Sequence, residues 1–239
     1  MPCSSGRNRM SVMLQILADR GPSPAFPPAS SIIPKPTRTT SLAGPLLPPR
    51  TAVFLEGLAA SAHYRVVDGC VATAQTLSDG RRQIIDLIGP GRLIGLGLGE
   101  HTGYSAETLG FTRLEAVSET ISQAERDLAL GEMLARAQGL VMLLGRKTAP
   151  ERVAFALLDL ARQFGRPARD KRRRAITFHL YPTRGDLADW LGLTVETVSR
   201  CFTRLKKAGL IDLERGDLVT VLDPQQLSGL AAGDRPLSH

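Results

Sequence analysis

Residues 183–200 read Thr183-Arg184-Gly185-Asp186-Leu187-Ala188-Asp189-Trp190-Leu191-Gly192-Leu193-Thr194-Val195-Glu196-Thr197-Val198-Ser199-Arg200. The first half of this stretch has Leu187, Ala188 and Leu191 at the spacing that gives a short helix one apolar face. Gly192 is expected to end that helix, because glycine reaches the left-handed backbone conformation at little cost. Thr194 is a good N-cap for a second helix. The stretch predicts a helix-turn-helix, which is typical of proteins that bind duplex DNA.

The second predicted helix has an apolar side and a polar side. Val198, Phe202 and Leu205 continue the apolar side, which is expected to face the domain core. The other side forms a predicted base-reading set, which consists of Val195, Glu196, Ser199 and Arg200.

The chemistry of this set suits the edges of bases in the major groove. Arg200 carries a planar fork of donors that matches the two acceptors of guanine, and Glu196 can accept the amino hydrogen of cytosine. Val195 offers methyl groups to thymine, and Ser199 can donate or accept. An alternative is that Glu196 and Arg200, four residues apart, form only a solvent-exposed ion pair. The preceding glycine turn favours base reading.

Charge is distributed unevenly along the chain, whose net charge is +7. Residues 51–127 hold six Lys and Arg against ten Asp and Glu, whereas residues 166–215 hold twelve against six. The basic excess therefore coincides with the helix-turn-helix, where it would meet phosphates. The run Arg169, Lys171, Arg172, Arg173 and Arg174 is either a phosphate-proximal loop, which we favour, or a solvated one. The predicted contacts to the DNA backbone are Thr183, Arg184, Thr194, Thr197 and Arg204.

Over about residues 50 to 228 the sequence resembles the Crp/Fnr superfamily of bacterial transcription regulators, and within it the FixK-like branch of the Fnr type. The Fnr-type recognition pattern Glu-x-x-Ser-Arg stands here as Glu196, Ser199 and Arg200, and Val195 takes the place of the arginine of the Crp type. Supporting motifs occur in the expected order: Glu56-Gly57, Tyr64 with Gly69, Leu77 to Ile84, Pro90-Gly91, and Pro150 to Ala154.

The middle of the chain predicts a β-rich domain followed by one long helix. From Ala52 to Ser122, short β-type runs alternate with turns such as Asp68-Gly69 and Asp79-Gly80, which suggests a compact antiparallel barrel or roll. The resemblance implies the double-stranded β-helix, or cupin-like β-roll, of this superfamily. The long helix is predicted from Arg126 to Arg146. A winged helix-turn-helix is expected after it, in which Ile211 to Leu222 form the wing around the turn Arg215-Gly216-Asp217. The expected fold class is therefore α+β.

Apolar residues on the long helix step by four and three, a seam suited to pairing with a second helix. These residues are Leu130, Leu134, Ala137, Val141 and Leu144. Burial of the whole helix within one subunit is the alternative. A parallel homodimer fits better, because a two-fold protein presents two recognition helices to successive major grooves.

Five segments are expected. Residues 1–48 form a disordered leader, because most of the sixteen prolines lie near this end and such a segment buries little apolar surface. They are followed by a sensor-like β-roll (49–125), a dimerisation helix (126–148), the winged helix-turn-helix (149–228) and a tail (229–239). No membrane span or signal peptide is expected, and the protein is read as cytoplasmic.

A cofactor is not expected. Cyclic-nucleotide-binding members of the superfamily have a glycine-rich turn and a glutamate, followed by an arginine that neutralises the phosphate. Here the stretch from Gly95 to Gly103 has the glycines and Glu100, but no arginine follows, and Glu107 would repel the phosphate. Cys3 and Cys70 are too few for the iron–sulfur cluster of the oxygen-sensing members. Haem could use His63 or His101, and gating by haem, nitric oxide or another small molecule stays an alternative. Cys201 is either a small buried hydrophobe or, less favoured, a redox switch.

The sequence therefore predicts a regulator and not an enzyme. A cupin-type enzyme, the remote alternative, would need a cluster of metal-ligating histidines and carboxylates, and the four histidines lack such spacing. We expect no catalytic residues and no metal. The resemblance implies a homodimeric activator that binds a palindrome of the TTGAT…ATCAA type, works with RNA polymerase and needs neither cyclic nucleotide nor iron–sulfur cluster.

Overall fold

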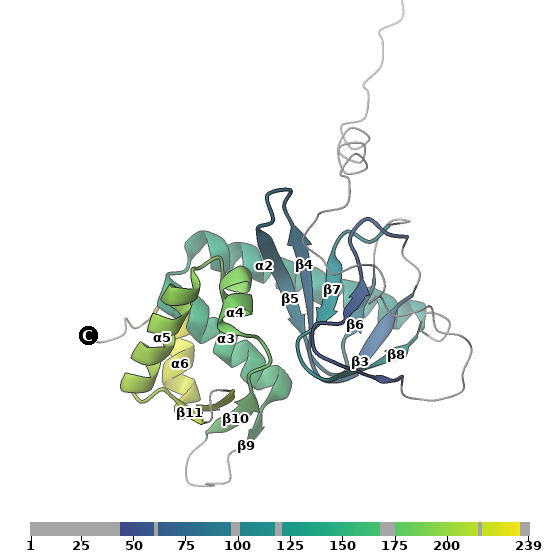
Figure 1. Cartoon of the computed structure of the whole chain (residues 1–239). Helices are drawn as coiled ribbons and strands as arrows, with labels where there is room; N and C mark the ends of the chain where they lie inside the picture. The colour runs from purple at the N-terminus through teal and green to yellow at the C-terminus, as the bar shows by residue number, and fades with distance from the viewer. Residues whose placement is uncertain are drawn as a thin grey trace, which may run out of the picture.

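The computed structural model of the protein describes residues 44–59, 62–96, 101–117, 121–167, 175–214 and 217–234. A β-rich lobe and a mostly helical lobe lie side by side, and a long helix runs behind both (Figure 1). Most of the expected leader, the basic run 169–174, Glu100 and the tip of the wing lie outside the described residues.

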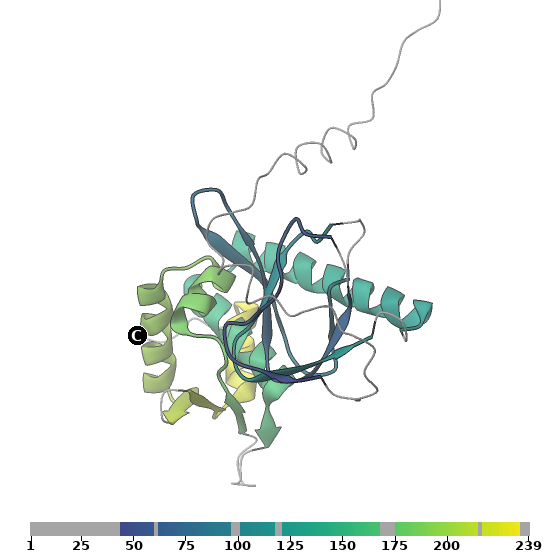
Figure 2. The same cartoon turned by 45° about the vertical axis from the view of Figure 1, so that its right-hand side comes forward.

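The N-terminal lobe is built from two four-stranded antiparallel sheets, with strand orders β1-β8-β3-β6 and β2-β7-β4-β5. The strands curve around a common interior (Figure 2). Alternation along the strands places Val66, Ile94 and Leu114 in that interior, where they are buried. The strands are β1 (Leu46–Leu47), β2 (Ala52–Phe54), β3 (Tyr64–Asp68), β4 (Val71–Thr76), β5 (Arg82–Ile88), β6 (Leu93–Ile94), β7 (Ser105–Thr108) and β8 (Thr112–Ala116). The predicted β-roll is confirmed.

One boundary of the β-roll differs from the expectation. Leu46 and Leu47 pair with Arg113 and Thr112 as strand β1, although both lie within the segment assigned to the leader. Leu47 is buried in the core of the β-roll, so the apolar pair gains enough from burial to order this end of the Pro-rich segment.

Helix α2 (Gln123–Arg146) follows, capped by the side chain of Ser122. By length and composition α2 could cross a membrane, since its 24 residues include a window of mean hydropathy 1.3. Its middle, however, carries Arg136, which donates hydrogen bonds to Asp86 of the β-roll and to Asp159. An arginine tied to two carboxylates at the centre of the helix fits packing on a protein surface and not burial in lipid.

The C-terminal lobe is a winged helix-turn-helix. Its small antiparallel sheet has the order β11-β12-β10-β9, in which the hairpin β11–β12 forms the predicted wing. The elements are α3 (Ala149–Phe164), β9 (Arg166–Pro167), β10 (Ile176–His179), α4 (Arg184–Leu191), α5 (Val195–Lys207), β11 (Ile211–Glu214), β12 (Leu218–Val221) and α6 (Pro224–Ala232).

The expected boundary between the winged helix-turn-helix and the tail also differs from the structure. Residues 229–232 continue α6 and do not begin a tail. Asp223 caps the helix, and Leu227, Leu230 and Ala231 are buried in the same core as α3. Packing of these three apolar residues therefore stabilises α6, because a helix this short is only marginally stable by its own helix propensity.

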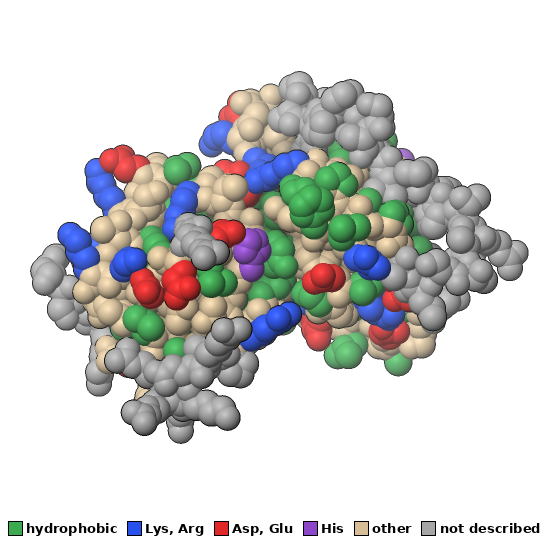
Figure 3. Space-filling view, turned by 60° about the horizontal axis from the view of Figure 1, so that its bottom comes forward, with side chains coloured by type: hydrophobic (Ala, Val, Ile, Leu, Met, Phe, Trp, Pro, Cys, Tyr) green, Lys and Arg blue, Asp and Glu red, His purple; other side chains and the backbone are tan. Residues whose placement is uncertain are grey.

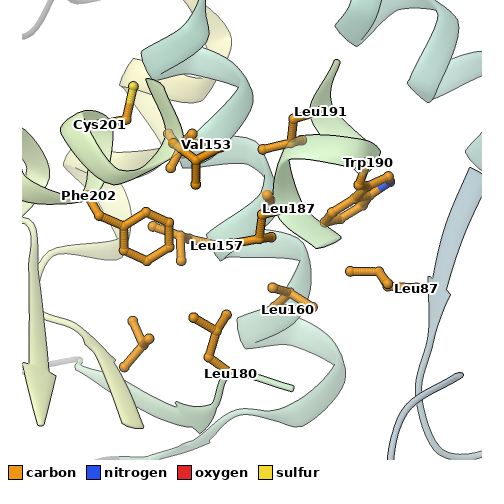
Figure 4. Close-up of a cluster of buried hydrophobic side chains, with 14 of the residues drawn as sticks. Leu87, Val153, Leu157, Leu160, Leu180, Leu187, Trp190, Leu191, Cys201 and Phe202 are labelled. Atoms are coloured by element: carbon orange, nitrogen blue, oxygen red, sulfur yellow. The ribbon is translucent and has the colours of Figure 1, made fainter. Parts of the chain in front are cut away.

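The two lobes share one hydrophobic core. Leu87 of the β-roll points towards Trp190 of α4 and Leu160 of α3 (Figure 4). All three side chains are at most 3% exposed and belong to one cluster that continues to Phe202 of α5. The pose of the helix-turn-helix relative to the β-roll is therefore fixed by packing as well as by the chain connection.

Candidate nucleic-acid interface

The first helix of the motif, α4, begins with a capping box. The hydroxyl of Thr183 accepts a hydrogen bond from the backbone N–H of Asp186 (3.1 Å), and the Asp186 carboxylate accepts one from the backbone N–H of Thr183 (2.9 Å). Two donors left over at the helix start are thereby satisfied. The helix ends at Gly192, whose φ of 60° is left-handed as the sequence predicted.

The second helix, α5, packs through its predicted apolar side. Thr194 caps its start by accepting from the backbone N–H of Thr197. Val198, Phe202 and Leu205 are buried, each at most 2% exposed. This packing turns the opposite side of the helix outward.

The predicted base-reading set lies together on this outward side. The side chains of Glu196 and Arg200 are 70% and 73% exposed, and Val195 is 51% exposed. Ser199 is also exposed, and its hydroxyl donates to the carbonyl of Val195 (2.9 Å). The face is convex and one helix wide, which is the shape that enters a major groove.

In the protein without DNA, Arg200 and Glu196 form an ion pair. Arg200 Nη2 lies 2.5 Å from Glu196 Oε1. An exposed pair of this kind contributes only about 0.3–0.5 kcal/mol to the helix, so little free energy is needed to release the guanidinium for a base. The ion pair and the base-reading role are compatible.

The predicted backbone contacts divide into four groups. Arg204 is exposed and free to point at a phosphate. Thr183 and Thr194 are the N-caps of α4 and α5, so their exposed ends mark two helix N-termini, where backbone N–H groups attract phosphate. Thr197 is half-buried, and its hydroxyl lies 2.9 Å from that of Thr194.

Arg184 forms the fourth group and departs from the expectation. Its guanidinium carbon lies 3.3 Å from the centroid of the Phe202 ring, against the core and not extended into solvent. Burial lowers the pKa of this guanidinium to about 10. Arg184 therefore joins α4 to α5 through a cation–π contact, and this geometry does not support a phosphate contact.

The predicted seam residues of α2 occupy different environments. Leu134 and Val141 are 60% and 71% exposed, whereas Leu130 and Ala137 are half-buried. Leu144 packs against the core shared by the two lobes. The free apolar face also contains two residues outside the predicted seam, Leu128 and Met142, which are 66% and 61% exposed.

A cavity of about 190 Å³ lies between the β-roll and α2. Its lining includes Tyr104, Met133 and two arginines. Arg92 is paired with Asp86 (2.7 Å), and Arg136 with Asp86 and Asp159. The positive charge in the cavity is therefore already neutralised by carboxylates.

The residues considered for cofactors lie apart. Both ring nitrogens of His63 are engaged, Nδ1 with the Gly95 carbonyl (3.0 Å) and Nε2 with Arg126 (2.9 Å), whereas His101 is exposed. Within the described parts of the chain, no three His, Cys, Asp or Glu side chains gather as metal ligands would. Cys201 is 4% exposed, and burial raises the pKa of its thiol, which fits the structural role better than a reactive one.

Sequence reasoning missed a cluster of charges between the two lobes. Arg50 and Arg82 of the β-roll reach Asp186 on α4, and Glu107 bridges the two arginines. From the sequence, Glu107 is expected only to repel the phosphate of a cyclic nucleotide. Arg50 and Asp186 lie 136 positions apart, so their contact leaves no local pattern in the sequence. The one available signal is Asp186 itself, a charged residue at a position that the helical pattern predicts to be buried.

Comparison with known proteins gives a consistent result. The sequence model of the Crp-like helix-turn-helix domain matches residues 151–230. The nitrogen fixation regulation protein FixK of Azorhizobium caulinodans is 38% identical over 188 residues, which cover 74% of this chain and 75% of that protein. The transcriptional activator protein anr of Pseudomonas aeruginosa is 34% identical, over 76% of this chain and 77% of that protein. The solved structure of FixK2 from Bradyrhizobium japonicum superposes with a TM-score of 0.70 at 31% identity, over 80% of this chain and 98% of that chain.

Proposed function

This chain belongs to the Crp/Fnr family as a FixK-like, DNA-binding transcription regulator, and on that basis we propose that it binds a TTGAT…ATCAA-type palindrome as a homodimer and activates transcription without a bound effector. It would act in the cytoplasm and work with RNA polymerase, as its likeness to a transcriptional activator suggests.

One observation carries the proposal of sequence-specific binding. Val195, Glu196, Ser199 and Arg200 share the outward face of α5, and none of them is held by the protein core. Arg200 would read the guanine of the G·C pair and Glu196 the cytosine, with Val195 and Ser199 beside the thymines.

The free face of α2 supports the proposal of a homodimer. Leu128, Leu134, Val141 and Met142 are exposed along it, whereas the opposite face packs on the β-roll. Large apolar side chains in a row along one helix are costly to leave in water. Two copies pairing along α2 would cover both faces and place two recognition helices on one side of the dimer.

An effector-gated regulator is the second candidate function. The cavity between the β-roll and α2 is the observation that favours it. Its volume of about 190 Å³ would admit only a small molecule. The arginines in its wall are already paired with Asp86 and Asp159, which leaves them poorly suited to a phosphate or another anion. We therefore favour binding without an effector.

The proposal is tested with protein purified in air and bound to the palindrome with no added ligand or metal. We expect two chains per palindrome, tight binding at moderate salt and no visible absorbance band. A requirement for cyclic AMP, or a haem or iron–sulfur band that tracks with binding, would favour the effector-gated alternative. Binding by a single chain per palindrome would contradict the homodimer.

A further inference from the structure

The boundary between the β-roll and the helix-turn-helix contains a cluster of five charged side chains. Two arginines of the β-roll converge on one carboxylate of α4: Arg50 donates to both oxygens of Asp186 (2.9 and 2.6 Å), and Arg82 Nη2 donates to Oδ1 (2.6 Å). The Asp186 side chain is only 2% exposed. A carboxylate this deeply buried depends on its partners, and two of the three guanidinium nitrogens involved come from Arg50.

Arg82 also binds two further carboxylates. Its Nη1 donates to Glu107 (2.6 Å), and its Nε donates to Asp189 (3.0 Å), which lies three residues after Asp186 on α4. Glu107 in turn accepts from Arg50 (2.8 Å), so that the two arginines are linked from the β-roll side. All three donor groups of the Arg82 fork are therefore used, and a planar fork of this kind fixes direction as well as distance.

The cluster holds α4 at the residues that define its start. Asp186 is the third residue of the helix and belongs to its capping box with Thr183. Arg50 adopts a left-handed conformation (φ 63°), which is unfavourable for a residue other than glycine and is kept only where the surroundings require it. The turn between β1 and β2 thus places this side chain beside α4 with Arg50 in an unfavourable backbone conformation.

Apolar contacts complete the same boundary, along which Figure 3 shows hydrophobic side chains. A side-chain carbon added to Gly89 would come within 2.7 Å of the Phe164 ring, and one added to Gly110 within 2.7 Å of the Tyr181 ring. Two glycines of the β-roll thus admit two aromatic rings of the other lobe. These apolar contacts favour docking of the lobes but depend less on direction than the hydrogen bonds of the two guanidinium groups.

The docked pose leaves the outward face of α5 and the free face of α2 uncovered. A two-fold protein must hold its recognition helices at one helical turn of DNA, about 34–36 Å between half-site centres. The orientation of α5 relative to α2 therefore decides which half-site spacing fits. In a regulator whose two lobes were not held in one pose, the orientation of α5 would have to be set by another interaction, such as a bound ligand.

We propose that Arg50 and Arg82 are positioning residues for DNA recognition: by holding Asp186 they preset the orientation of the recognition helix, so that the preferred half-site spacing is built into the protein. This inference rests on the proposed binding of a palindrome by a homodimer. Arg50 and Arg82 would then play the role that a bound effector plays in an effector-gated regulator.

The test compares Arg82→Met with Arg81→Met. Arg81 is the adjacent residue, is 77% exposed, and its side chain bonds only to Asp79 of its own hairpin among the described residues. Each purified dimer is titrated with palindromes whose spacer is native, or longer or shorter by one base pair. We expect Arg82→Met to lower the preference for the native spacer roughly five- to tenfold, while Arg81→Met matches the parent. Arg82→Lys should lie between Arg82→Met and the parent, because a lysine keeps the charge but not the fork.

Hydrogen exchange without DNA separates this inference from the proposed function. In Arg82→Met, the α4 amides should exchange faster while those of the β-roll remain protected. Should Arg82→Met fail to fold, Asp189→Asn removes one contact and is expected to shift both readouts in the same direction. A folded, dimeric Arg82→Met with the parental spacer preference and α4 protection would overturn the inference. The parent protein could instead show no preference for the palindrome, while α4 still exchanges faster in Arg82→Met than in the parent. That result would overturn the proposed function and leave the docking role of Arg82 supported.

Discussion

The guanidinium carbon of Arg184 lies 3.3 Å from the ring centroid of Phe202, so the first and second helices of the DNA-binding motif are joined by a cation–π contact. The sequence alone assigned Arg184 to the phosphate backbone. Its position against the core makes it a stabilising residue of the motif.

Replacing Arg184 with Ala should therefore lower stability and leave the electrostatics of DNA binding unchanged. We expect a loss of about 1–2 kcal/mol in the free energy of unfolding, because the cation–π pair is partly desolvated. Urea titration measures this loss. The slope of log affinity against log salt should equal that of the parent, and a shallower slope would return Arg184 to the phosphate contacts.

Arg204→Ala is the matched comparison and should behave in the opposite way. The side chain is exposed on α5, so its removal should leave the free energy of unfolding nearly unchanged. The salt slope should become shallower by about 0.9 for each phosphate that the variant no longer neutralises. An unchanged slope would show that Arg204 does not reach the backbone.

Asp186 should make stability depend on pH in the acidic range. Burial alone would raise the pKa of this carboxyl, but hydrogen bonds from Arg50 and Thr183 outweigh it and hold the pKa at about 2, below the usual 3.8. Because the folded pKa lies below the unfolded one, the stabilising contribution of Asp186 is complete above about pH 5 and is lost progressively as the pH falls through 3.8 and then through 2.

The measurement is the difference in unfolding free energy between the parent and Asp186→Asn at pH 6 and at pH 3. A shift of this size corresponds to roughly 2 kcal/mol, so the parent's advantage should shrink visibly at the lower pH. A difference that stays constant between the two pH values would contradict the depressed pKa.

The free face of α2 should carry the dimer. Changing Leu134 and Val141 to Asp would bury unpaired carboxylates at the pairing face, which is costly. Light scattering should report a monomer, and circular dichroism should show an intact β-roll. Leu77→Asp, at an exposed apolar position on the β4–β5 hairpin, is the control and should remain dimeric. A dimeric Leu134→Asp/Val141→Asp variant would show that the copies pair elsewhere.

Local signals in the sequence were sufficient for the motif itself. The left-handed Gly192, the Thr194 cap and the hairpin from Ile211 to Val221 depend on residues within a few positions of each other. The β-roll was predicted as a class, from the turns at Asp68-Gly69 and Asp79-Gly80 together with the resemblance. Its first strand was missed, because two leucines among prolines carry no period.

The seam of α2 shows where helical spacing reaches its limit. Apolar residues occur on several sides of this helix, so their four- and three-residue steps are satisfied by more than one face. Only the position of the β-roll shows that Leu143 and Leu144 face the protein's own core while Leu134 and Val141 stay outside. The arginine cluster on Asp186 depends likewise on the packing of one lobe against the other.

Base reading by Arg200 is tested by comparing two DNAs that differ only at the base pair it would contact. Arg200→Ala and the parent are titrated at fixed salt with the palindrome and with a copy in which the G·C pair of each half-site is replaced by A·T. We expect Arg200→Ala to lose about 1–3 kcal/mol per half-site on the palindrome and no longer to distinguish the two DNAs. Arg204→Ala, tested in parallel, should bind both DNAs more weakly and keep the distinction. If Arg200→Ala still prefers the G·C palindrome by the parental ratio, Arg200 does not read this base pair.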